Sequence, residues 1–249
     1  MFRKVCEIMD KWILVTGASS GIGEVVSKFL SSQGYGIVMV ARNSDKLNEM
    51  SKILPSKNIY ISYDLSDLEH IEDIFTICKE KMIKLDGLVH CAGINNDIPI
   101  RSNDIKVMQD VTTINYFSFV EMGKYFCKKK YSNDGASVVA ISSSAADACM
   151  KGMCTYSASK AALNASVKVM GKEFLKRHQR VNAVMPSFVD TPMAKQVDEA
   201  LGDLDSKIAS QPLGLIEPIQ IAYLVEFLIS DKSAYMTGAC IPISGGAIL

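Results

Sequence analysis

Short apolar runs alternate along this chain with longer segments whose apolar residues recur at helical spacing. The apolar runs are 12–16, 36–41, 58–62, 87–91, 137–141, 181–185 and a last short one near 240–243. Segments long enough for helices lie between the first six of them, at 21–33, 44–54, 68–83, 105–130 and 155–178. Continuous apolar strands separated by helices are typical of a parallel sheet that is covered on both faces. Right-handed crossovers then predict a Rossmann-like, doubly wound α/β fold of about seven strands.

The length of the chain, 249 residues, is normal for one α/β unit. No long linker, repeat or low-complexity tract interrupts it, so we expect residues 1–249 to form a single domain. Its cofactor half would span about 10–135, and its catalytic and substrate half about 136–249. The longest irregular stretch, 187–214, follows the sixth apolar run at the carboxyl edge of the sheet, where ligands bind in such folds.

The charges are balanced, with 27 Lys plus Arg and 27 Asp plus Glu. The chain therefore lacks the basic excess of a general nucleic-acid-binding protein. Charged residues interrupt the N-terminal segment, which lacks the apolar core of a signal peptide. No segment reaches the roughly 18 uncharged apolar residues that a membrane span needs. The sequence predicts a cytoplasmic protein that binds neither nucleic acid nor membrane.

The seven cysteines are odd in number and include no Cys-x-x-Cys pair. Disulfides and structural zinc are therefore not expected, and buried reduced thiols are favoured. The three histidines, His70, His90 and His178, lie in separate segments without ligand spacing, so no metal is predicted.

The first apolar run leads directly into a glycine-rich turn, Thr16-Gly17-Ala18-Ser19-Ser20-Gly21-Ile22-Gly23, and then into a helical segment. Glycines let the backbone approach a pyrophosphate, and the N–H groups at a helix N-terminus bind the anion. The strand–turn–helix context separates such a site from an ordinary turn. The residues predicted to hold a dinucleotide here are Gly17, Ser19, Ser20, Gly21, Ile22 and Gly23.

The residues after the second and third runs indicate which dinucleotide binds. An NAD site usually has Asp or Glu after the second run, whereas Arg42 offers a cation that suits a 2′-phosphate. NADP(H) is therefore favoured over NAD(H), the alternative being that Arg42 only starts a solvated helix. Asp64, followed by Leu65, could accept a hydrogen bond from the adenine amino group or cap the next helix.

Tyr156 and Lys160 are four residues apart in a helical segment, so their side chains share one face. A lysine cation favours the tyrosinate and lowers a pKa that is normally about 10. Tyr156 would then donate and accept protons near neutral pH, although surface Tyr–Lys pairs at this spacing are also common. Ser142, Ser143 and Ser144 end the fifth run, where their hydroxyls could donate to a carbonyl or bond their own backbone.

The combined pattern resembles the short-chain dehydrogenase/reductase family over nearly the whole chain. Residues 16–23 are similar to its Thr-Gly-x-x-x-Gly-x-Gly turn, and 90–93 (His-Cys-Ala-Gly) to its Asn-Asn-Ala-Gly segment. Residues 182–186 resemble the strand that covers the nicotinamide, and 235–246 the C-terminal segment. The residues that match the four catalytic positions of the family are Asn115, Ser143, Tyr156 and Lys160.

The resemblance implies an oxidoreductase in which hydride passes between a nicotinamide and a ketone carbon. Tyr156 would protonate the oxygen and Ser143 would hydrogen-bond it. Lys160 would lower the tyrosine pKa and hold the ribose hydroxyls, and Asn115 would support a water that links Lys160 to solvent. The further cofactor contacts that the resemblance implies are Cys91, Ala92, Gly93, Tyr156, Lys160, Pro186, Val189 and Thr191.

Some positions depart from the family pattern. His90 and Cys91 replace two asparagines, and we expect this to affect sheet packing and adenosine-side contacts more than chemistry. Ser187 stands where a glycine is usual, which adds a side chain close to the nicotinamide. Ser20 stands where NADP(H) enzymes often have Arg or Lys, so the NADP(H) prediction depends mainly on Arg42.

The substrate would be a small carbonyl or alcohol compound. Flexible methionines suit an apolar or adaptable substrate, although most buried methionines are simply core. Val197 would add apolar surface to the pocket. The residues expected to line that pocket are Ser143, Ser144, Ala145, Met150, Met153, Tyr156, Phe188 and Met193.

The length and C-terminal pattern are most similar to those of the 3-oxoacyl-carrier-protein reductases. One hypothesis is therefore a thioester on acyl carrier protein or coenzyme A, with Arg177 and residues 128–130 as basic docking residues. These cations could equally complement the C-terminal ends of helices. Gln211-Pro212-Leu213-Gly214 and Glu217-Pro218 resemble the turn that precedes a helix in these reductases. Reductases of sugars, steroids and small ketones have similar turns, so these substrates remain alternatives.

Two other functions compete with an oxidoreductase. One is a dinucleotide-binding sensor or scaffold without turnover, and the other is a nucleotide-sugar epimerase or dehydratase. The four intact catalytic positions disfavour the first, and the short segment after the last apolar run disfavours the second. Apolar faces at 112–130 and 155–178 would pack against a second subunit in a homodimer or homotetramer, as in the family, or against the sheet.

Overall fold

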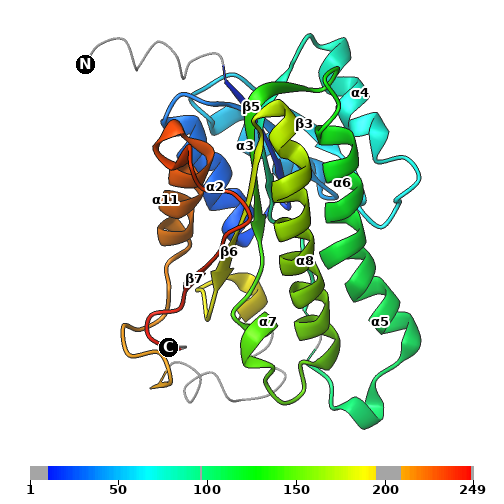
Figure 1. The fold of residues 1–249 in the computed structure, drawn as a ribbon, viewed down its shortest axis with the longest axis vertical. Coiled ribbons are helices and arrows are strands. Elements are labelled where there is room, and N and C mark those ends of the chain that lie inside the picture. Colours follow the sequence, from blue (N-terminus) through cyan, green and yellow to red (C-terminus); the bar gives the residue numbers. More distant parts are fainter. Residues whose placement is uncertain (1–10, 96, 195–208, 248–249) are drawn as a thin grey trace.

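The computed structural model describes residues 11–95, 97–194 and 209–247 (Figure 1). Its seven strands form one sheet in the order β3-β2-β1-β4-β5-β6-β7, and every neighbouring pair is parallel. The predicted doubly wound α/β fold in one domain is confirmed. The strands are β1 (Trp12–Thr16), β2 (Gly36–Ala41), β3 (Asn58–Ser62), β4 (Leu85–His90), β5 (Ser132–Ile141), β6 (Arg180–Pro186) and β7 (Cys240–Ile243).

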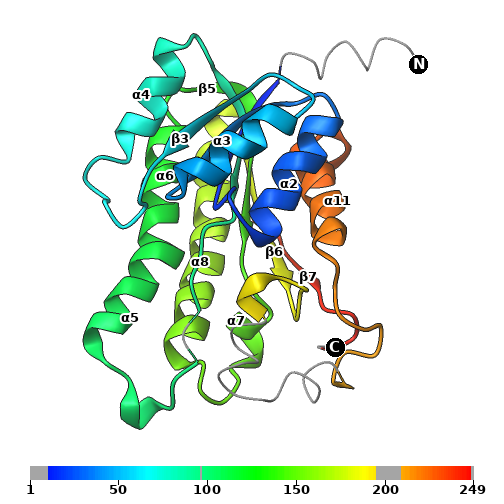
Figure 2. The ribbon, with the colours of Figure 1, turned by 180° about the vertical axis from the view of Figure 1, so that it is seen from behind.

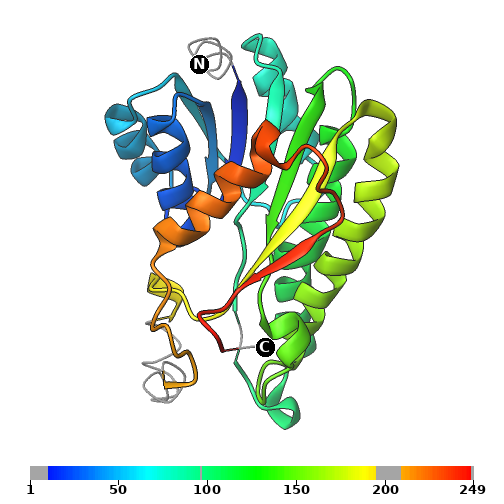
Figure 3. The ribbon, with the colours of Figure 1, turned by 60° about the vertical axis from the view of Figure 1, so that its left-hand side comes forward.

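Helices cover both faces of the sheet, which lies between them in Figure 3. The helices α2 (Gly21–Ser32), α3 (Ser44–Ile53) and α11 (Pro218–Ile229) bury one face (Figure 2). The other face is buried by α4 (Glu72–Glu80), α6 (Ser118–Phe126) and α8 (Cys154–Glu173). Ile13 and Leu14 are adjacent in β1 but belong to the two different apolar clusters. Because the strands are buried on both faces, they occur in the sequence as uninterrupted apolar runs.

Several boundaries differ from the prediction. The single helix expected at 105–130 consists of α5 (Ile105–Thr112), the π segment η2 (Thr113–Phe117) and α6. The helix expected at 68–83 begins only at Glu72, after a turn in which Asp67 accepts the N–H of His70 at 3.3 Å. After α8 the chain continues as the 3-10 segment η3 (Phe174–Arg177). Periodicity predicted no helix at the position of α11 (Pro218–Ile229), and only the resemblance of Glu217-Pro218 to a pre-helix turn pointed to one.

The topology fixes where a ligand can bind. From β1 the chain builds the sheet outward to β2 and β3, whereas from β4 it builds in the opposite direction to β7. Thr16 and His90, at the ends of β1 and β4, lie side by side in the sheet. A crevice opens at the carboxyl ends of strands at such a switch point. The short helix α7 (Ala145–Ala148) lies at the same end of the molecule (Figure 1).

The expectation of buried thiols is only partly correct. The six cysteines within the described ranges are free. Cys78 is buried, but Cys149 and Cys154 are exposed, because they lie in and just after the turn between α7 and α8.

Arg180, the first residue of β6, is buried and holds the C-terminal end of α11. Its guanidinium donates to the carbonyl oxygens of Ile229 (3.3 Å), Ser230 (3.1 Å) and Ser233 (3.0 Å). Burial lowers the pKa of Arg180. The five donors of a guanidinium suit a helix end, where several carbonyls lack a partner within the helix.

We expect Arg180→Met to lower the free energy of unfolding by about 3 kcal/mol, because several buried carbonyls lose their donor. Urea denaturation followed by circular dichroism measures this change. Lys172→Met, at an exposed position in α8, is the control and should change that free energy by less than about 0.5 kcal/mol. Equal effects of the two substitutions would contradict the helix-holding role of Arg180.

Candidate active site

Two adjoining cavities lie at the carboxyl ends of the strands, and Gly93 lines both of them. The larger, of about 480 Å³, lies beside the ends of β1, β2 and β3. The smaller, of about 160 Å³, lies beside the ends of β5 and β6 and the beginning of α8. The position of both cavities agrees with the switch point between β1 and β4.

The glycine turn forms one wall of the larger cavity. Gly17 has φ +65°, and a Cβ added to it would lie only 2.9 Å from the backbone N of Ala92. The Oγ1 of Thr16 accepts the N–H groups of Cys91 and Ala92, both at 3.1 Å. The turn therefore packs so closely against residues 91–92 that only glycine fits at position 17.

The structure brings most of the predicted cofactor residues to the two cavities. Those that line the larger cavity are Gly17, Ser19, Ser20, Arg42, Asp64, Leu65, Ala92 and Gly93. Those that line the smaller one are Ile22, Cys91, Gly93, Tyr156, Lys160, Pro186, Val189 and Thr191. Gly21 and Gly23 are not among the lining residues; a Cβ on Gly21 would lie 3.6 Å from the Thr191 side chain.

Arg42 and Asp64, which follow β2 and β3, both line the larger cavity. Helix α3 begins after Asn43, whose side chain accepts the N–H of Lys46 at 3.0 Å, so Arg42 precedes the cap. Asp64 Oδ1 accepts from the N–H and the hydroxyl of Ser66, at 3.0 and 2.9 Å. These hydrogen bonds lower the pKa of Asp64, with a smaller contribution from Arg42. Asp64 thus closes a local turn, and the alternative that it caps the next helix is wrong.

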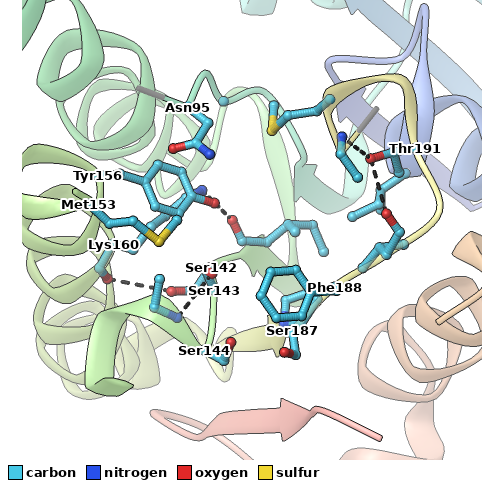
Figure 4. Close-up of a pocket in the computed structure, with 18 of the residues that line it drawn as sticks. Asn95, Ser142, Ser143, Ser144, Met153, Tyr156, Lys160, Ser187, Phe188 and Thr191 are labelled. Carbon is cyan, nitrogen blue, oxygen red and sulfur yellow. Dashed lines mark hydrogen bonds between the residues drawn. The ribbon is translucent and has the colours of Figure 1, made fainter. Parts of the chain in front are cut away.

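All eight residues predicted to contact substrate line the smaller cavity, and Figure 4 shows several of them. Helix α8 supplies Tyr156 and Lys160, the end of β5 leads into Ser143, and Phe188 follows β6. Of the irregular stretch 187–214, only 187–194 and 209–214 are described, and Val197 lies outside these residues. Asn95 and Asp97 also line this cavity and were not predicted from the sequence. Their position just beyond the carboxyl end of β4 was the available signal.

Burial controls the protonation of Tyr156 and Lys160. Lys160 Nζ donates to the carbonyl of Ile141 at 2.8 Å and lies 5.8 Å from the centre of the Tyr156 ring. Burial lowers the pKa of Lys160 to about 8. Burial also raises the pKa of Tyr156, a rise that a hydrogen bond with Ser143 opposes and the charge of Asp97 increases.

The expected lowering of the Tyr156 pKa by Lys160 is therefore wrong for this structure. The lysine ammonium is directed at the Ile141 carbonyl, and desolvation of the phenol dominates. Near neutral pH Tyr156 is a neutral phenol, which suits it to donate a proton.

Asn115 lies in the π segment, fully buried behind the cavity wall. Its Oδ1 accepts the N–H of Ile94 at 2.8 Å, and its Nδ2 donates to the Ile94 carbonyl at 2.9 Å and to Ser159 Oγ at 3.0 Å. A Cβ on Gly93 would lie 3.2 Å from Asn115 Oδ1 and 3.4 Å from Lys160 Nζ. Gly93 therefore leaves room for the amide and the ammonium to lie close together, and π segments are frequent at functional sites.

The basic residues considered for carrier docking lie at the opposite edge of the sheet. Residues 128–130 precede β5 and Arg177 precedes β6, at the amino ends of these strands. Lys130 pairs with Glu72 at 3.0 Å, and Arg177 pairs with Asp134 at 2.7 Å. Arg177 also donates to the Cys127 carbonyl at 2.8 Å, close to the end of α6. The structure thus places Lys130 and Arg177 in contacts near helix ends, away from the two cavities.

A search of the described residues finds no helix that is both long and apolar enough to cross a membrane. Within the same residues no group of three or more His, Cys, Asp or Glu side chains could hold a metal ion.

Known proteins are similar in sequence to this chain over nearly its full length. A family model described as "Enoyl-(Acyl carrier protein) reductase" matches residues 17–247. The 3-oxoacyl-[acyl-carrier-protein] reductase FabG of Thermotoga maritima is 30% identical over 247 residues, which cover 96% of this chain and 98% of that protein. Carbonyl reductase family member 4 of Danio rerio is 31% identical over 245 residues, covering 96% of this chain and 98% of that protein.

Solved structures share the fold closely. A dehydrogenase/reductase from Sinorhizobium meliloti 1021 superposes with a TM-score of 0.91 at 27% identity, covering 100% of both chains. A short-chain type dehydrogenase/reductase from Mycobacterium ulcerans gives a TM-score of 0.90 at 26% identity, covering 96% of this chain and 90% of that one. The chain belongs to the short-chain dehydrogenase/reductase family and is an NAD(P)-dependent oxidoreductase.

Proposed function

We propose that this protein is an NADP(H)-dependent oxidoreductase that reduces a ketone to a secondary alcohol, or catalyses the reverse reaction, with Ser143, Tyr156, Lys160 and Asn115. The observation that carries the proposal is that Ser143 and Tyr156 line the smaller cavity together with the buried Lys160, whose Nζ lies 5.8 Å from the centre of the Tyr156 ring. Two hydroxyl groups that line one cavity can hold a carbonyl oxygen and stabilise the charge that develops on it.

The larger cavity fits a dinucleotide. Gly17 permits close approach of a pyrophosphate to the backbone, and α2 begins directly after the turn. Arg42 supplies a cation for the 2′-phosphate, and the second oxygen of Asp64 supplies an acceptor for the adenine amino group. The part of the chain at about 10–135 would thus bind the nucleotide, and that at about 136–249 the substrate. The bound nicotinamide would supply or take up the hydride.

The residues of the smaller cavity have separate tasks in this reaction. Tyr156, neutral because burial raises its pKa, would donate its proton to the carbonyl oxygen as hydride arrives at the carbon. Ser143 would donate a second hydrogen bond to that oxygen. Lys160 would bind ribose hydroxyls and stabilise the tyrosinate that remains after proton transfer. Asn115 would keep the adjacent backbone in place and support a water next to Lys160, through its two hydrogen bonds to Ile94.

A 3-oxoacyl thioester is the substrate class that we propose first. The relatives compared above include 3-oxoacyl-[acyl-carrier-protein] reductases, and Met150, Met153, Phe188 and Met193 line the smaller cavity. These flexible apolar side chains suit an acyl chain. The acyl group would be carried by coenzyme A or by acyl carrier protein. We do not assign carrier docking to Arg177 and residues 128–130, because they lie at the opposite edge of the sheet from the two cavities.

The direct test is oxidation of NADPH and of NADH by the purified protein with a panel of ketones. The panel contains 3-oxoacyl-coenzyme A thioesters of increasing chain length, sugars, steroid ketones and small diketones. We expect turnover with NADPH and a 3-oxoacyl thioester. Tight NADPH binding without turnover of any ketone would favour the sensor hypothesis instead.

We expect Arg42→Ala to raise the KM for NADPH about 10- to 100-fold and to leave the KM for NADH nearly unchanged, because only NADPH has the 2′-phosphate that Arg42 would bind. Steady-state kinetics with both cofactors measure the ratio. Lys46→Ala, at an exposed position in α3 that is not among the cavity-lining residues, is the control. If Arg42→Ala weakened both cofactors equally, the predicted NADP(H) preference would lose its basis.

We also propose that the protein forms a homodimer or homotetramer. Phe117 in the π segment and Val169 in α8 are both about half exposed, at 45% and 54%, on helices that cover the same face of the sheet. A second subunit could cover these side chains.

A further inference from the structure

His90, the last residue of β4, is fully buried between the glycine turn and the beginning of α6. Its Nδ1 lies 3.1 Å from Oγ1 of Thr16, the residue that opens the glycine turn. Its Nε2 lies 3.4 Å from Oγ of Ser118, the first residue of α6 directly after the π segment. The ring also packs against Phe119, with centroids 5.5 Å apart. His90 thus spans the distance between the glycine turn and the segment that contains Asn115.

The hydrogen bonds around Thr16 determine the tautomer of His90. Thr16 Oγ1 accepts the N–H groups of Cys91 and Ala92, both at 3.1 Å. Its own proton is therefore available for Nδ1 of His90, which must act as the acceptor. Nε2 then carries the ring proton, because a neutral imidazole has one donor and one acceptor.

The other side of the ring continues the chain of hydrogen bonds. Ser118 Oγ donates to the carbonyl of Ile114 at 2.7 Å, so it can accept the Nε2 proton of His90. Ile114 immediately precedes Asn115 in the π segment. Donors and acceptors thus alternate without conflict from Thr16 through His90 and Ser118 to the backbone next to Asn115.

Protonation of the ring would place a second proton on Nδ1, opposite the hydroxyl proton of Thr16. Burial lowers the pKa of His90 to about 3, and the positive charge of Lys160 acts in the same direction, whereas a hydrogen bond with the Ile114 backbone acts against both. The ring therefore stays neutral, and the hydrogen-bonded chain stays intact, at every pH where an enzyme of this kind works.

We propose that His90 is a positioning residue that couples the glycine turn to the π segment carrying Asn115. The coupling depends on histidine at this position, because its Nε2 lies one bond farther from the backbone than the amide nitrogen of an asparagine would. An asparagine, as in the Asn-Asn-Ala-Gly motif, could accept from Thr16 but would end short of Ser118 (the contact already measures 3.4 Å). This inference rests on the proposed function, since the two segments that it couples are those that would bind the cofactor and support Lys160.

Ser118→Ala and His90→Asn test the coupling, because each interrupts the chain on its Nε2 side and neither residue is among those lining the two cavities. We expect each to raise the Kd for NADPH, measured by fluorescence titration without turnover, and to lower kcat, both by about three- to tenfold. The double variant should match His90→Asn alone, because the connection is already broken there. Hydrogen–deuterium exchange of the peptide covering residues 16–23 should increase in both single variants.

Ser137→Ala is the matched control. Its hydroxyl is also buried and also donates to one backbone carbonyl, that of Leu228 at 2.9 Å, but Ser137 is not among the cavity-lining residues. It should lower Tm about as much as Ser118→Ala and leave the NADPH Kd, kcat and exchange of the glycine turn unchanged.

A purely structural role for Ser118 and His90 would give lowered Tm with wild-type exchange of the glycine turn, and this result would overturn the proposal. Additive effects in the double variant would overturn it as well. The exchange measurement needs neither cofactor nor substrate, so it separates the two proposals. If wild-type protein fails to bind NADPH while Ser118→Ala still loosens the turn, the proposed function is wrong and the coupling stands.

Discussion

Tyr156→Phe should lower kcat for ketone reduction by about 10³-fold and change the Kd for NADPH by less than about threefold. The variant keeps the ring and loses only the phenol oxygen, which is the proton donor of the proposed reaction. Burial keeps this phenol neutral, so the wild-type enzyme has its proton in place near neutral pH. Steady-state kinetics with the best substrate of the panel, together with a fluorescence titration of NADPH, measure the two quantities.

Tyr223→Phe is the control for this substitution. Tyr223 is half-exposed on α11 and packs edge-to-face on Phe29, with ring centroids 5.1 Å apart. Removal of its hydroxyl should leave kcat unchanged. If Tyr156→Phe retained most of the wild-type rate, another group would be the proton donor, and the assignment of Ser143 and Tyr156 to the carbonyl oxygen would fail.

The strands were predictable because their burial on both faces leaves a strong pattern in the sequence. All six residues of β2 are buried, and the run 36–41 was placed without error. Helix α11 shows the limit of this pattern. Its buried residues, such as Ile221 and Val225, are mixed with partly buried Ile219 and Leu224, so the segment is apolar nearly all round. An apolar run of this kind does not separate a helix from a buried strand by periodicity alone.

The π segment could not be predicted for a different reason. One wider turn at Thr113–Phe117 changes the backbone hydrogen bonds but hardly disturbs the helical spacing of apolar residues on either side. The sequence therefore indicated one helix through 105–130. The amide of Asn115 projects from this wider turn to hydrogen-bond Ile94, a contact that depends on how the helix packs against the end of β4.

The sequence predicted most of the residues that line the two cavities but not their electrostatics. The spacing of Tyr156 and Lys160 placed both side chains on one face of α8, and both line the smaller cavity. The sequence could not show that Lys160 Nζ would reach the carbonyl of Ile141 at the end of β5. It also could not show how deeply Lys160 is buried. The pKa of Tyr156 is raised rather than lowered, because desolvation of the phenol exceeds the opposing hydrogen bond with Ser143, and the charge of Asp97 raises the pKa further.

If Lys160 acts as proposed, its burial implies that catalysis and stability make opposite demands on this residue. The pKa of Lys160 falls from 10.5 to about 8 in the folded protein. Below pH 8 the side chain is charged in both the folded and the unfolded states, so folding bears the full cost of burying the charge. As pH rises from 8 to 10.5 the folded protein has lost the proton and the unfolded chain still holds it, so this cost decreases.

We expect Lys160→Met to lower kcat at least about 100-fold and, at pH 7, to raise the free energy of unfolding by about 1–2 kcal/mol. The gain is smaller than the full pKa shift implies, because the hydrogen bond to the Ile141 carbonyl, worth about 1 kcal/mol, is lost. The gain in the free energy of unfolding should shrink as pH rises from 8 toward 10.5.

Urea denaturation at pH 7 and pH 10 measures this gain. Lys168→Met, at an exposed position in the same helix, is the control and should show no such gain. A variant less stable than the wild type at pH 7 would mean that the Ile141 hydrogen bond outweighs the cost of burying the charge, and the low pKa of Lys160 would then need another cause.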